Sequence, residues 1–299
     1  MEECYVDKKN TVLLGSILEQ VQKIPDESIQ VIVTSPPYYK LRNYAQNEAE
    51  QELEIGQEPN VETYISDIKD VFHKLKPKLK KNGLLWLNLG DTYINKEQQG
   101  IPWRVALALI QDGWILRSDV IWHKPNAMPS SVKNRPTTDH EYMFMFAKSK
   151  DYYYDADAIR EPHVTFSDKS KMKGGRNHFG INGGTPEQGK NSGNGNLHSG
   201  RWDQAFNPKG RNKRTVWSIP VSRFTGAHFA VFPEKLVETP ILASSKPDDI
   251  VFDPFTGSGT TGVVSAKLGR VFWGTELVPE YQKMAQNRID NISIDISLF

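Results

Sequence analysis

Residues 249–262 read DIVFDPFTGSGTTG, and this stretch decides the fold class. An apolar run with the pattern of a buried strand leads into Gly257, Gly259 and Gly262, and helix-forming residues follow. Three glycines let the backbone turn tightly and approach a ligand, while the helix presents its first N–H groups. The next predicted strand ends on Glu276, where an acid would bond ribose hydroxyls. By itself this pattern fits either a dinucleotide site or a strand-to-helix turn whose glycines serve packing.

The same alternation of strands and helices continues outward from this turn. Buried strands are predicted at 10–15, 29–36, 84–90, 115–122, 140–148, 249–255 and 270–277. Apolar residues at helical spacing predict helices at 61–80, 101–111, 233–244, 260–268 and 279–289. In the first of these helices, Pro77 would kink the last turn and Asn82-Gly83 would end the helix. Trp103 and Trp114 lie on apolar faces and are expected in the core. The chain is therefore expected to be an α/β layer protein.

Composition limits where and how the protein works. Its 299 residues are 38% apolar and 24% charged, which excludes a disordered chain and allows a substantial core. The apolar stretches are short and the N-terminus has no hydrophobic segment, so neither a membrane span nor a secretory signal is expected. Cys4 is the single cysteine, which excludes an internal disulfide and favours reducing surroundings. We therefore expect a cytoplasmic protein.

The net charge of +1 is an average over unlike regions. Residues 160–223 hold twelve basic and four acidic side chains, a net charge of +8, with Trp202 and Phe206 among them. Ten of the 22 glycines fall between residues 174 and 210, too many for a tight core. Such a stretch is either a solvated loop or a surface that meets phosphates and bases.

A second motif follows the predicted strand at 29–36, where the chain reads Thr34-Ser35-Pro36-Pro37-Tyr38. Two consecutive prolines end any strand pairing and stiffen the backbone, so the Ser35 hydroxyl and the neighbouring carbonyls are held at fixed positions. These acceptors suit a planar ligand whose exocyclic amino group bonds to Ser35 and the Pro36 carbonyl while its ring stacks on Tyr38. A nucleobase taken out of a duplex is such a ligand. By itself the motif is equally consistent with a loop stiffened by proline.

Together, the motifs resemble a known family. The TSPPY turn (34–38), IWHKPN (121–126) and FTGSGTTG (255–262) with GTEL (274–277) resemble, in this order, the beta group of DNA methyltransferases that methylate amino groups with S-adenosylmethionine. The resemblance spans roughly residues 10–150 and 226–290. It implies a seven-stranded Rossmann-like sheet with helices on both faces and a permuted order of motifs. It further implies a catalytic half at 1–150, a target-recognition insert at 151–225 and a cofactor-binding half at 226–299.

The resemblance also assigns roles to individual residues. The residues that match the catalytic motif are Ser35, Pro36, Pro37 and Tyr38. Those that match cofactor-binding segments are Asp253, Phe255, Gly257 and Gly259 in the loop, Glu276 as the ribose-binding acid, and His228 and Phe229 toward the methionine part. Many relatives carry an acid after the glycine that ends the first strand, where it contacts the adenine amino group. Here Ser16 follows Gly15, and Ser16 becomes the candidate at that end.

The serine of the catalytic motif bears on the base. Family members with Ser-Pro-Pro-Tyr mostly make N4-methylcytosine, whereas adenine methylators usually carry aspartate in place of the serine. The resemblance thus implies N4 methylation of a flipped cytosine in double-stranded DNA, associated with the nucleoid when bound, within a restriction–modification system whose endonuclease acts separately. The alternatives are an adenine N6 methyltransferase on DNA or RNA and a non-catalytic nucleic-acid-binding module. The sequence has no Cys/His cluster with zinc-ligand spacing, so no metal is expected.

The insert is expected to supply the contacts with DNA. The candidates for phosphate contacts are Lys209, Arg211, Lys213 and Arg214, and the candidates for reading bases are Arg176, Arg201 and Arg223, because a guanidinium can bond in two places. Two further segments admit two interpretations each. Asp91 either touches the cofactor or caps a turn. The segment 123–126 either contacts nucleic acid or forms an ordinary turn.

Overall fold

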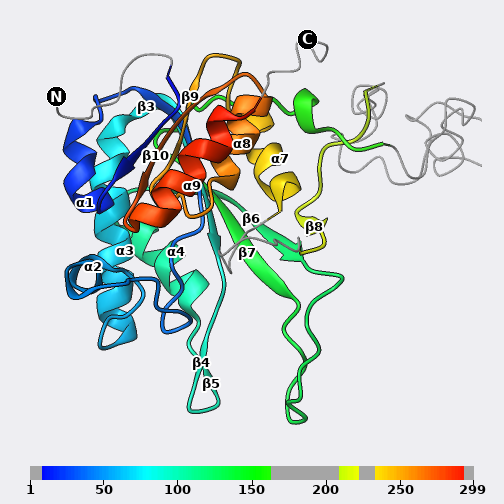
Figure 1. Ribbon diagram of the computed structural model, residues 1–299. Helices are drawn as coiled ribbons and strands as arrows, with labels where there is room; N and C mark the ends of the chain where they lie inside the picture. The colour runs from blue at the N-terminus through cyan, green and yellow to red at the C-terminus, as the bar shows by residue number, and fades with distance from the viewer. Residues whose placement is uncertain (1–8, 163–208, 222–232, 293–299) are drawn as a thin grey trace, which may run out of the picture. The chain divides into compact units, whose positions relative to one another are not determined.

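The computed structural model describes residues 9–162, 209–221 and 233–292, and Figure 1 shows their helices and strands. The chain divides into two compact units, one of residues 1–155 with 215–299 and one of residues 156–214. The second unit falls within the segment 151–225 that the sequence sets apart as an insert.

An eight-stranded sheet runs through the first unit in the order β1-β10-β9-β2-β3-β7-β6-β8. Its strands are β1 (Thr11–Leu14), β2 (Ile29–Thr34), β3 (Leu79–Leu89), β6 (Ile115–His123), β7 (His140–Ala147), β8 (Val216–Ser218), β9 (Ile250–Asp253) and β10 (Val271–Glu276). Neighbours pair in parallel except at β7, which is antiparallel to both β3 and β6. The α/β class predicted from the sequence is confirmed, and each of the seven predicted strands is present.

The eighth strand differs from the expectation of seven. Residues near the end of the predicted insert, just after the second unit, pair with the open edge of β6. There the amide of Ile121 donates to the carbonyl of Thr215 at 2.8 Å, and the amide of Ile219 donates to the carbonyl of His123 at 3.0 Å. The strand β8 exists because β6 offers unpaired backbone groups at that edge. Three residues are too few to show a strand pattern in the sequence. A separate two-stranded hairpin, β4 (Tyr93–Ile94) with β5 (Glu97–Gln98), was not predicted either.

The helices of the first unit fill both faces of this sheet. They are α1 (Ile17–Gln20), α2 (Glu48–Leu53), α3 (Val61–Leu75), α4 (Ile101–Gln111), α7 (Glu234–Ser244), α8 (Thr260–Lys267) and α9 (Pro279–Asp290), with short 3-10 turns η1 (Val21–Lys23) and η2 (Lys76–Lys78). The second unit holds one more such turn, η3 (Asp157–Ile159). Every helix expected over the described residues forms.

The predicted end of the first long helix was wrong. Asn82 and Gly83 were expected to end it, but α3 stops at Leu75, and both residues lie inside β3. Pro77 sits in the 3-10 turn that follows, where its missing N–H costs least. Leu79 then pairs with Ile29 and starts the strand. The helix therefore ends five residues before the predicted position because the proline and the sheet compete for the same segment.

The side chains of the central strand β2 bury against different helices on its two faces. In β2, Ile29 and Ile32 join a cluster with residues of α1, α3 and α4, whereas Val31 and Val33 join a cluster with residues of α7. Figure 1 shows these two sets of helices on opposite faces of the sheet. Each such side chain contributes roughly 1.5–3 kcal/mol when fully buried. The central strands are thus fixed in register from both sides.

The two tryptophans expected in the core behave differently. Trp114 is 2% exposed, as predicted. Trp103 is 38% exposed, so its assignment to the core was wrong. Its ring meets Phe144 edge-on with centroids 5.1 Å apart and covers the sheet from outside.

The parallel strands bring their carboxyl ends to one edge of the sheet. From β9 the chain passes through α8 to β10 on one side, and from β2 it passes through α3 to β3 on the other side. Neighbouring strands whose connections diverge in this way leave a crevice beyond their carboxyl ends, which is where open α/β sheets bind ligands. The two sequence motifs follow β2 and β9, the two strands that flank this crevice.

Candidate active site

A cavity of about 450 Å³ opens at the crevice between β2 and β9. Cofactor and ligand pockets span roughly 300–1,000 Å³, so this cavity has the size of a binding site. Both motifs line it, with Ser35, Pro36, Pro37 and Tyr38 on one side and Phe255, Gly257 and Glu276 on the other. Ser16 lines it as well. The structure therefore brings the predicted catalytic motif to one site with four of the six predicted cofactor residues that it describes.

The turn after β2 is fastened at both ends. The hydroxyl of Thr34 donates to Oδ1 of Asp253 at 2.6 Å, which ties the end of β2 to the end of β9. The fully buried Tyr64 of α3 donates its hydroxyl to the carbonyl of Pro37 at 2.8 Å. Between these bonds the two prolines restrict the backbone, so the half-buried Ser35 is presented to the cavity at a fixed place.

Tyr38 is held against the end of β3. A Cβ atom added to Gly90 would lie 2.6 Å from Cε2 of the Tyr38 ring, so only glycine leaves room for the ring at this place. Burial and, next, the negative charge of Glu141 raise the pKa of Tyr38 well above its ordinary value. The phenol therefore stays protonated and acts as a hydrogen-bond donor at any working pH.

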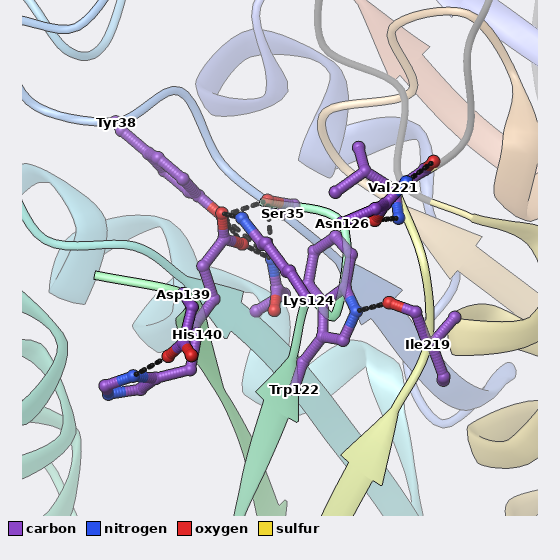
Figure 2. Close-up of polar contacts among 11 residues, drawn as sticks. Ser35, Tyr38, Trp122, Lys124, Asn126, Asp139, His140, Ile219 and Val221 are labelled. Carbon is purple, nitrogen blue, oxygen red and sulfur yellow. Dashed lines mark hydrogen bonds and ion pairs between the residues drawn. The ribbon is translucent and has the colours of Figure 1, made fainter. Parts of the chain in front are cut away.

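On the base-binding side of the cavity, two polar residues were not predicted from the sequence. Asn88 lies near the end of β3 and Glu141 near the start of β7, and both line the cavity. Figure 2 shows polar contacts gathered around the Tyr38 hydroxyl, beside Ser35 and Lys124. The available signal was a polar side chain within the apolar run LLWLNLG, because a buried amide in a strand requires partners.

The glycine-rich loop shapes the other side of the cavity. The amide of Gly257, a residue with φ of +53°, donates to Oε2 of Glu276 at 2.7 Å. The amide of Val278 donates to Oε1 of the same carboxylate at 3.0 Å. The carboxylate at the end of β10 thus fixes the loop after β9 and still faces the cavity.

Asp253 and Gly259 support this loop from behind and do not line the cavity. The buried carboxylate of Asp253 accepts hydrogen bonds from Thr34, from Thr261 at 2.6 Å and from the amide of Phe255 at 3.0 Å. Burial raises its pKa to about 6 against the opposing effect of these bonds. Gly259 has φ of +84°, and a Cβ there would lie 2.9 Å from Ala285 of α9. Both residues therefore hold the loop in place.

At the end of β1, Ser16 faces the cavity but also caps a helix. Its hydroxyl oxygen accepts from the amide of Leu18 at 3.3 Å, at the start of α1. Glu54, which follows α2, lines the same cavity, and its Oε1 accepts from the amide of Tyr44. The other oxygen, Oε2, is buried and has no hydrogen-bond donor among the described residues. His228 and Phe229 lie outside the described residues.

Four of the cations that the structure describes in the second unit, Arg160, Lys209, Arg211 and Lys213, are paired with acids of that unit. Asp157 contacts Arg160 at 2.6 Å and Lys209 at 3.2 Å. Glu161 contacts Arg211 at 3.2 Å and Lys213 at 3.3 Å. Three of the four predicted phosphate-binding residues therefore already meet a carboxylate. The three arginines predicted to read bases, at 176, 201 and 223, lie outside the described residues.

Asp91 and the segment 123–126, for which the sequence allowed two interpretations each, have defined contacts in the structure. Asp91 accepts from the amides of Gly100 at 2.9 Å and Ile101 at 3.1 Å, so it caps the start of α4, and it does not line the cavity. Within 123–126, Lys124 lines the cavity, whereas Asn126 exchanges hydrogen bonds with the backbone of Val221 (Figure 2). Among the described residues there is no group of three His, Cys, Asp or Glu side chains that could hold a metal.

Over the part of the chain that the structure describes, the helices lack the combination of length and apolar character that spanning a bilayer requires.

Comparison with known proteins places the chain in a family. A model of DNA methylases matches residues 29–287. The Type II methyltransferase M.Cfr9I of Citrobacter freundii is 38% identical, with the match covering 93% of this chain and 87% of the relative. The Type II methyltransferase M.SmaI of Serratia marcescens is 36% identical, over 96% of this chain and 94% of the relative.

Solved structures show the same fold. PvuII DNA methyltransferase (cytosine-N4-specific) superposes with a TM-score of 0.67 at 22% identity, covering 97% of this chain and 90% of that one. The DNA modification methylase TTHA0409 of Thermus thermophilus, in complex with S-adenosyl-L-methionine, gives a TM-score of 0.59 at 22% identity, covering 95% and 96%.

The chain belongs to the DNA methylases that modify amino groups, at cytosine N4 or adenine N6, with S-adenosylmethionine. It is a DNA methyltransferase of the restriction–modification type, similar throughout its length to Type II enzymes. The family resemblance, the fold and the cofactor predicted from the sequence are thereby confirmed.

Proposed function

We propose that the protein methylates the N4 amino group of a cytosine flipped out of double-stranded DNA. Ser35 is the observation that carries this proposal, because a neutral hydroxyl stands at the acceptor position of the turn, beside Tyr38 and opposite the glycine-rich loop. Relatives with serine at this position mostly make N4-methylcytosine. The cytosine-N4 specificity in the name of the PvuII enzyme, which shares the fold, agrees with this choice.

The residues around the cavity fit S-adenosylmethionine. Glu276 would accept from the ribose hydroxyls, and the backbone of the loop at Phe255 and Gly257 would lie along the methionine part. Oε2 of Glu54, which has no donor among the described residues, would accept from an amino group of the ligand, such as that on adenine. When bound, the cofactor supplies a methyl group on a sulfonium, so that an N–C bond forms as an S–C bond breaks.

The turn after β2 would hold the base. Ser35 and the carbonyl of Pro36 would accept the hydrogens of the exocyclic amine, which directs the nitrogen lone pair toward the methyl group. Tyr38 would stack on the ring, a contact worth on the order of 1–3 kcal/mol per base. No covalent intermediate is needed for this transfer, so the protein acts by positioning and orientation. The insert would bind the duplex and choose the sequence.

The test is chemical identification of the product. Plasmid DNA from a host without DNA methylation is incubated with the protein and S-adenosylmethionine, digested to nucleosides and analysed by mass spectrometry. We expect N4-methyldeoxycytidine. N6-methyldeoxyadenosine would replace the cytosine assignment with an adenine one. Unmodified DNA would contradict methyl transfer and favour the alternative of a non-catalytic nucleic-acid-binding module. Because the relatives are Type II methyltransferases, we also expect a separately acting endonuclease of the same restriction–modification system. It should fail to cut the sites that the protein has methylated.

A further inference from the structure

The carboxylate of Glu141 occupies a central place in the cavity that the proposed function leaves unexplained. Its Oε2 accepts from the hydroxyl of Tyr38 at 2.7 Å and from Nδ2 of Asn88 at 2.7 Å. Its Oε1 accepts from the ammonium of Lys124. The side chain of Glu141 is 14% exposed and that of Lys124 is 20% exposed, so this ion pair lies largely out of water at the base-binding side of the cavity.

The chemistry of these groups fixes the direction of each hydrogen bond. An ionised carboxylate only accepts, so Tyr38 must give its single proton to Glu141. The Tyr38 oxygen then accepts from the hydroxyl of Ser35 at 3.1 Å and from Nδ2 of Asn88 at 2.8 Å. Ser35 in turn donates its hydroxyl proton to Tyr38. The hydrogen bonds are therefore donated from Ser35 to Tyr38 and from Tyr38 to Glu141.

This order leaves the lone pairs of Ser35 for a ligand. The amide of Asn88 has two hydrogens, and its two short contacts are with Glu141 and Tyr38. Its distance to Oγ of Ser35 is 3.4 Å, which marks a weak contact at best. Ser35 therefore presents an acceptor to the cavity, as a primary amine with two hydrogens requires. Were the carboxylate absent, Tyr38 could donate to Ser35 and the direction could reverse.

We propose that Glu141 is a positioning residue for methyl transfer, which orients the hydroxyls of Tyr38 and Ser35 and takes up the proton that the methylated amine releases. This inference rests on the proposed function only in that the substrate is an exocyclic amine, and it holds for cytosine and adenine alike. It acts through Tyr38 and Ser35, since Glu141 reaches the amine only by way of them.

The proton balance of this step closes. As the nitrogen gains the methyl group it becomes cationic and gives one N–H proton to Oγ of Ser35. Ser35 passes its own proton to Tyr38, and Tyr38 passes its proton to Oε2 of Glu141. One positive charge on the sulfonium and one negative charge on the carboxylate are consumed together, and the ammonium of Lys124 stays unchanged. Each group in the relay loses one proton and gains one, except Glu141, which ends neutral.

Tyr38→Phe separates this proposal from a role in stacking alone. Phenylalanine keeps the ring, so stacking by itself predicts an active enzyme. The relay predicts loss of activity, because removal of the hydroxyl disconnects Ser35 from Glu141.

The experiment measures methyl transfer in a single turnover, with enzyme in excess over unmethylated plasmid DNA and S-adenosylmethionine saturating. Glu141→Gln and Tyr38→Phe should each lower the transfer rate constant by about 10²-fold or more, the scale of a lost proton-transfer group. The Kd for S-adenosylmethionine by calorimetry and the Kd for DNA by filter binding should stay at the wild-type values. The double variant should be no slower than either single variant, because both break one chain.

The matched control is Glu62→Gln, the same substitution at another ion-paired carboxylate. Glu62 contacts Arg104 at 2.8 Å on the surface, with its side chain 73% exposed, and this variant should transfer methyl groups like the wild type. If Glu141→Gln does not fold, judged by thermal unfolding, Tyr38→Phe still decides.

A wild-type rate in Glu141→Gln, a wild-type rate in Tyr38→Phe, or effects that multiply in the double variant would overturn the relay. These outcomes are distinct from failure of the proposed function, in which the wild-type protein itself leaves the plasmid unmodified and the relay has no reaction to serve.

Discussion

At the residue scale, Glu276 should make cofactor binding depend on pH. Burial raises the pKa of Glu276 from its ordinary 4.5 to about 7, against the opposing effect of the amides of Val278 and Gly257. Two ribose hydroxyls need the ionised carboxylate, because protonation removes an acceptor position. The affinity for S-adenosylmethionine should therefore increase as the pH rises through about 7, and binding below that pH should release a proton. Calorimetry in two buffers with different ionisation enthalpies measures both.

Glu276→Gln is the variant that isolates this effect. It should bind the cofactor more weakly, by roughly 1.5–3 kcal/mol for each missing bond to a charged group, and its affinity should be flat across the same pH range. A pH dependence equal to that of the wild type would remove Glu276 from the ribose site.

The same pKa shift should act on the stability of the cofactor-free protein with the opposite sign. A carboxyl whose pKa is raised on folding stabilises the fold while it is protonated, so its contribution is complete below the unfolded value and is lost as the pH rises through the folded value. For Glu276 that window runs from 4.5 to about 7, and Asp253 adds to it from 3.8 to about 6. The Tm should fall across this window, and it should fall less in Glu276→Gln. An equal fall in both proteins would contradict the assignment.

Gly90 should control catalysis through the ring that lies on it. A methyl group at this position would come within 2.6 Å of the Tyr38 ring, so Gly90→Ala should displace Tyr38 from its place beside Ser35. We expect methyl transfer to fall by an order of magnitude or more while S-adenosylmethionine binds with unchanged affinity, since Gly90 lies on the base side of the cavity. Normal turnover in a folded Gly90→Ala protein would show that the ring has room to move.

At the scale of elements, Asp91 should stabilise the start of α4 and have no part in cofactor binding. The amides at the start of a helix have no partners inside it, and across the hairpin β4–β5 Asp91 accepts from the amide of Gly100, just before α4, and from that of Ile101, its first residue. Asp91→Ala should therefore lower the free energy of unfolding by about 0.5–2 kcal/mol, the cost of a missing cap. Urea unfolding measures this, with Asp70→Ala, an exposed acid on α3, as the control. Unchanged stability with weaker cofactor binding would reverse the assignment.

How far the sequence predicts an element depends on its length. The helix expected at 101–111 forms over those residues as α4, because eleven residues show three turns of apolar spacing. The strand β8 and the helix α1, of three and four residues, show no period and were missed. The end of α3 was misplaced because local signals named a stop at Asn82-Gly83, whereas the pairing of Leu79 with Ile29 is a contact between distant segments.

For the residues of the site, what could be predicted depends on whether they are consecutive in the sequence. Ser35, Tyr38 and Glu276 sit in motifs of consecutive residues, so a single sequence marks them. Asn88 and Glu141 are 53 residues apart and meet because β3 and β7 pair antiparallel, with Leu89 opposite Tyr142. No local pattern records that register. A buried amide in β3 was the one available clue, and it indicates a missing partner without naming it.

At the scale of the whole molecule, DNA affinity should come from the insert, but less from its described cations than their number suggests. Lys209, Arg211 and Lys213 each contact Asp157 or Glu161, so these cations would have to leave a carboxylate to meet a phosphate. Each ion pair with a phosphate adds about 0.9 to the steepness of log K against log salt. We therefore remove these three cations together with Arg214. The slope of log K against log salt should then decrease by clearly less than the decrease expected from the loss of four ion pairs with phosphates.

The comparison that decides is a second variant without Arg176, Arg201 and Arg223, measured in the same salt series on plasmid-derived target and non-target duplexes. Residues 160–223 carry a net charge of +8, and cations that are paired with a carboxylate add nothing to that net charge. We therefore expect each of these three arginines to account for more of the salt dependence than each paired cation does. An arginine that bonds a guanine edge in the major groove should also relax specificity at one position by roughly 1–3 kcal/mol when it is removed. If the four-residue variant instead abolished the salt dependence and the arginine variant kept it, the ion pairs with Asp157 and Glu161 would open on DNA, and the phosphate-binding face would be the one these acids now occupy.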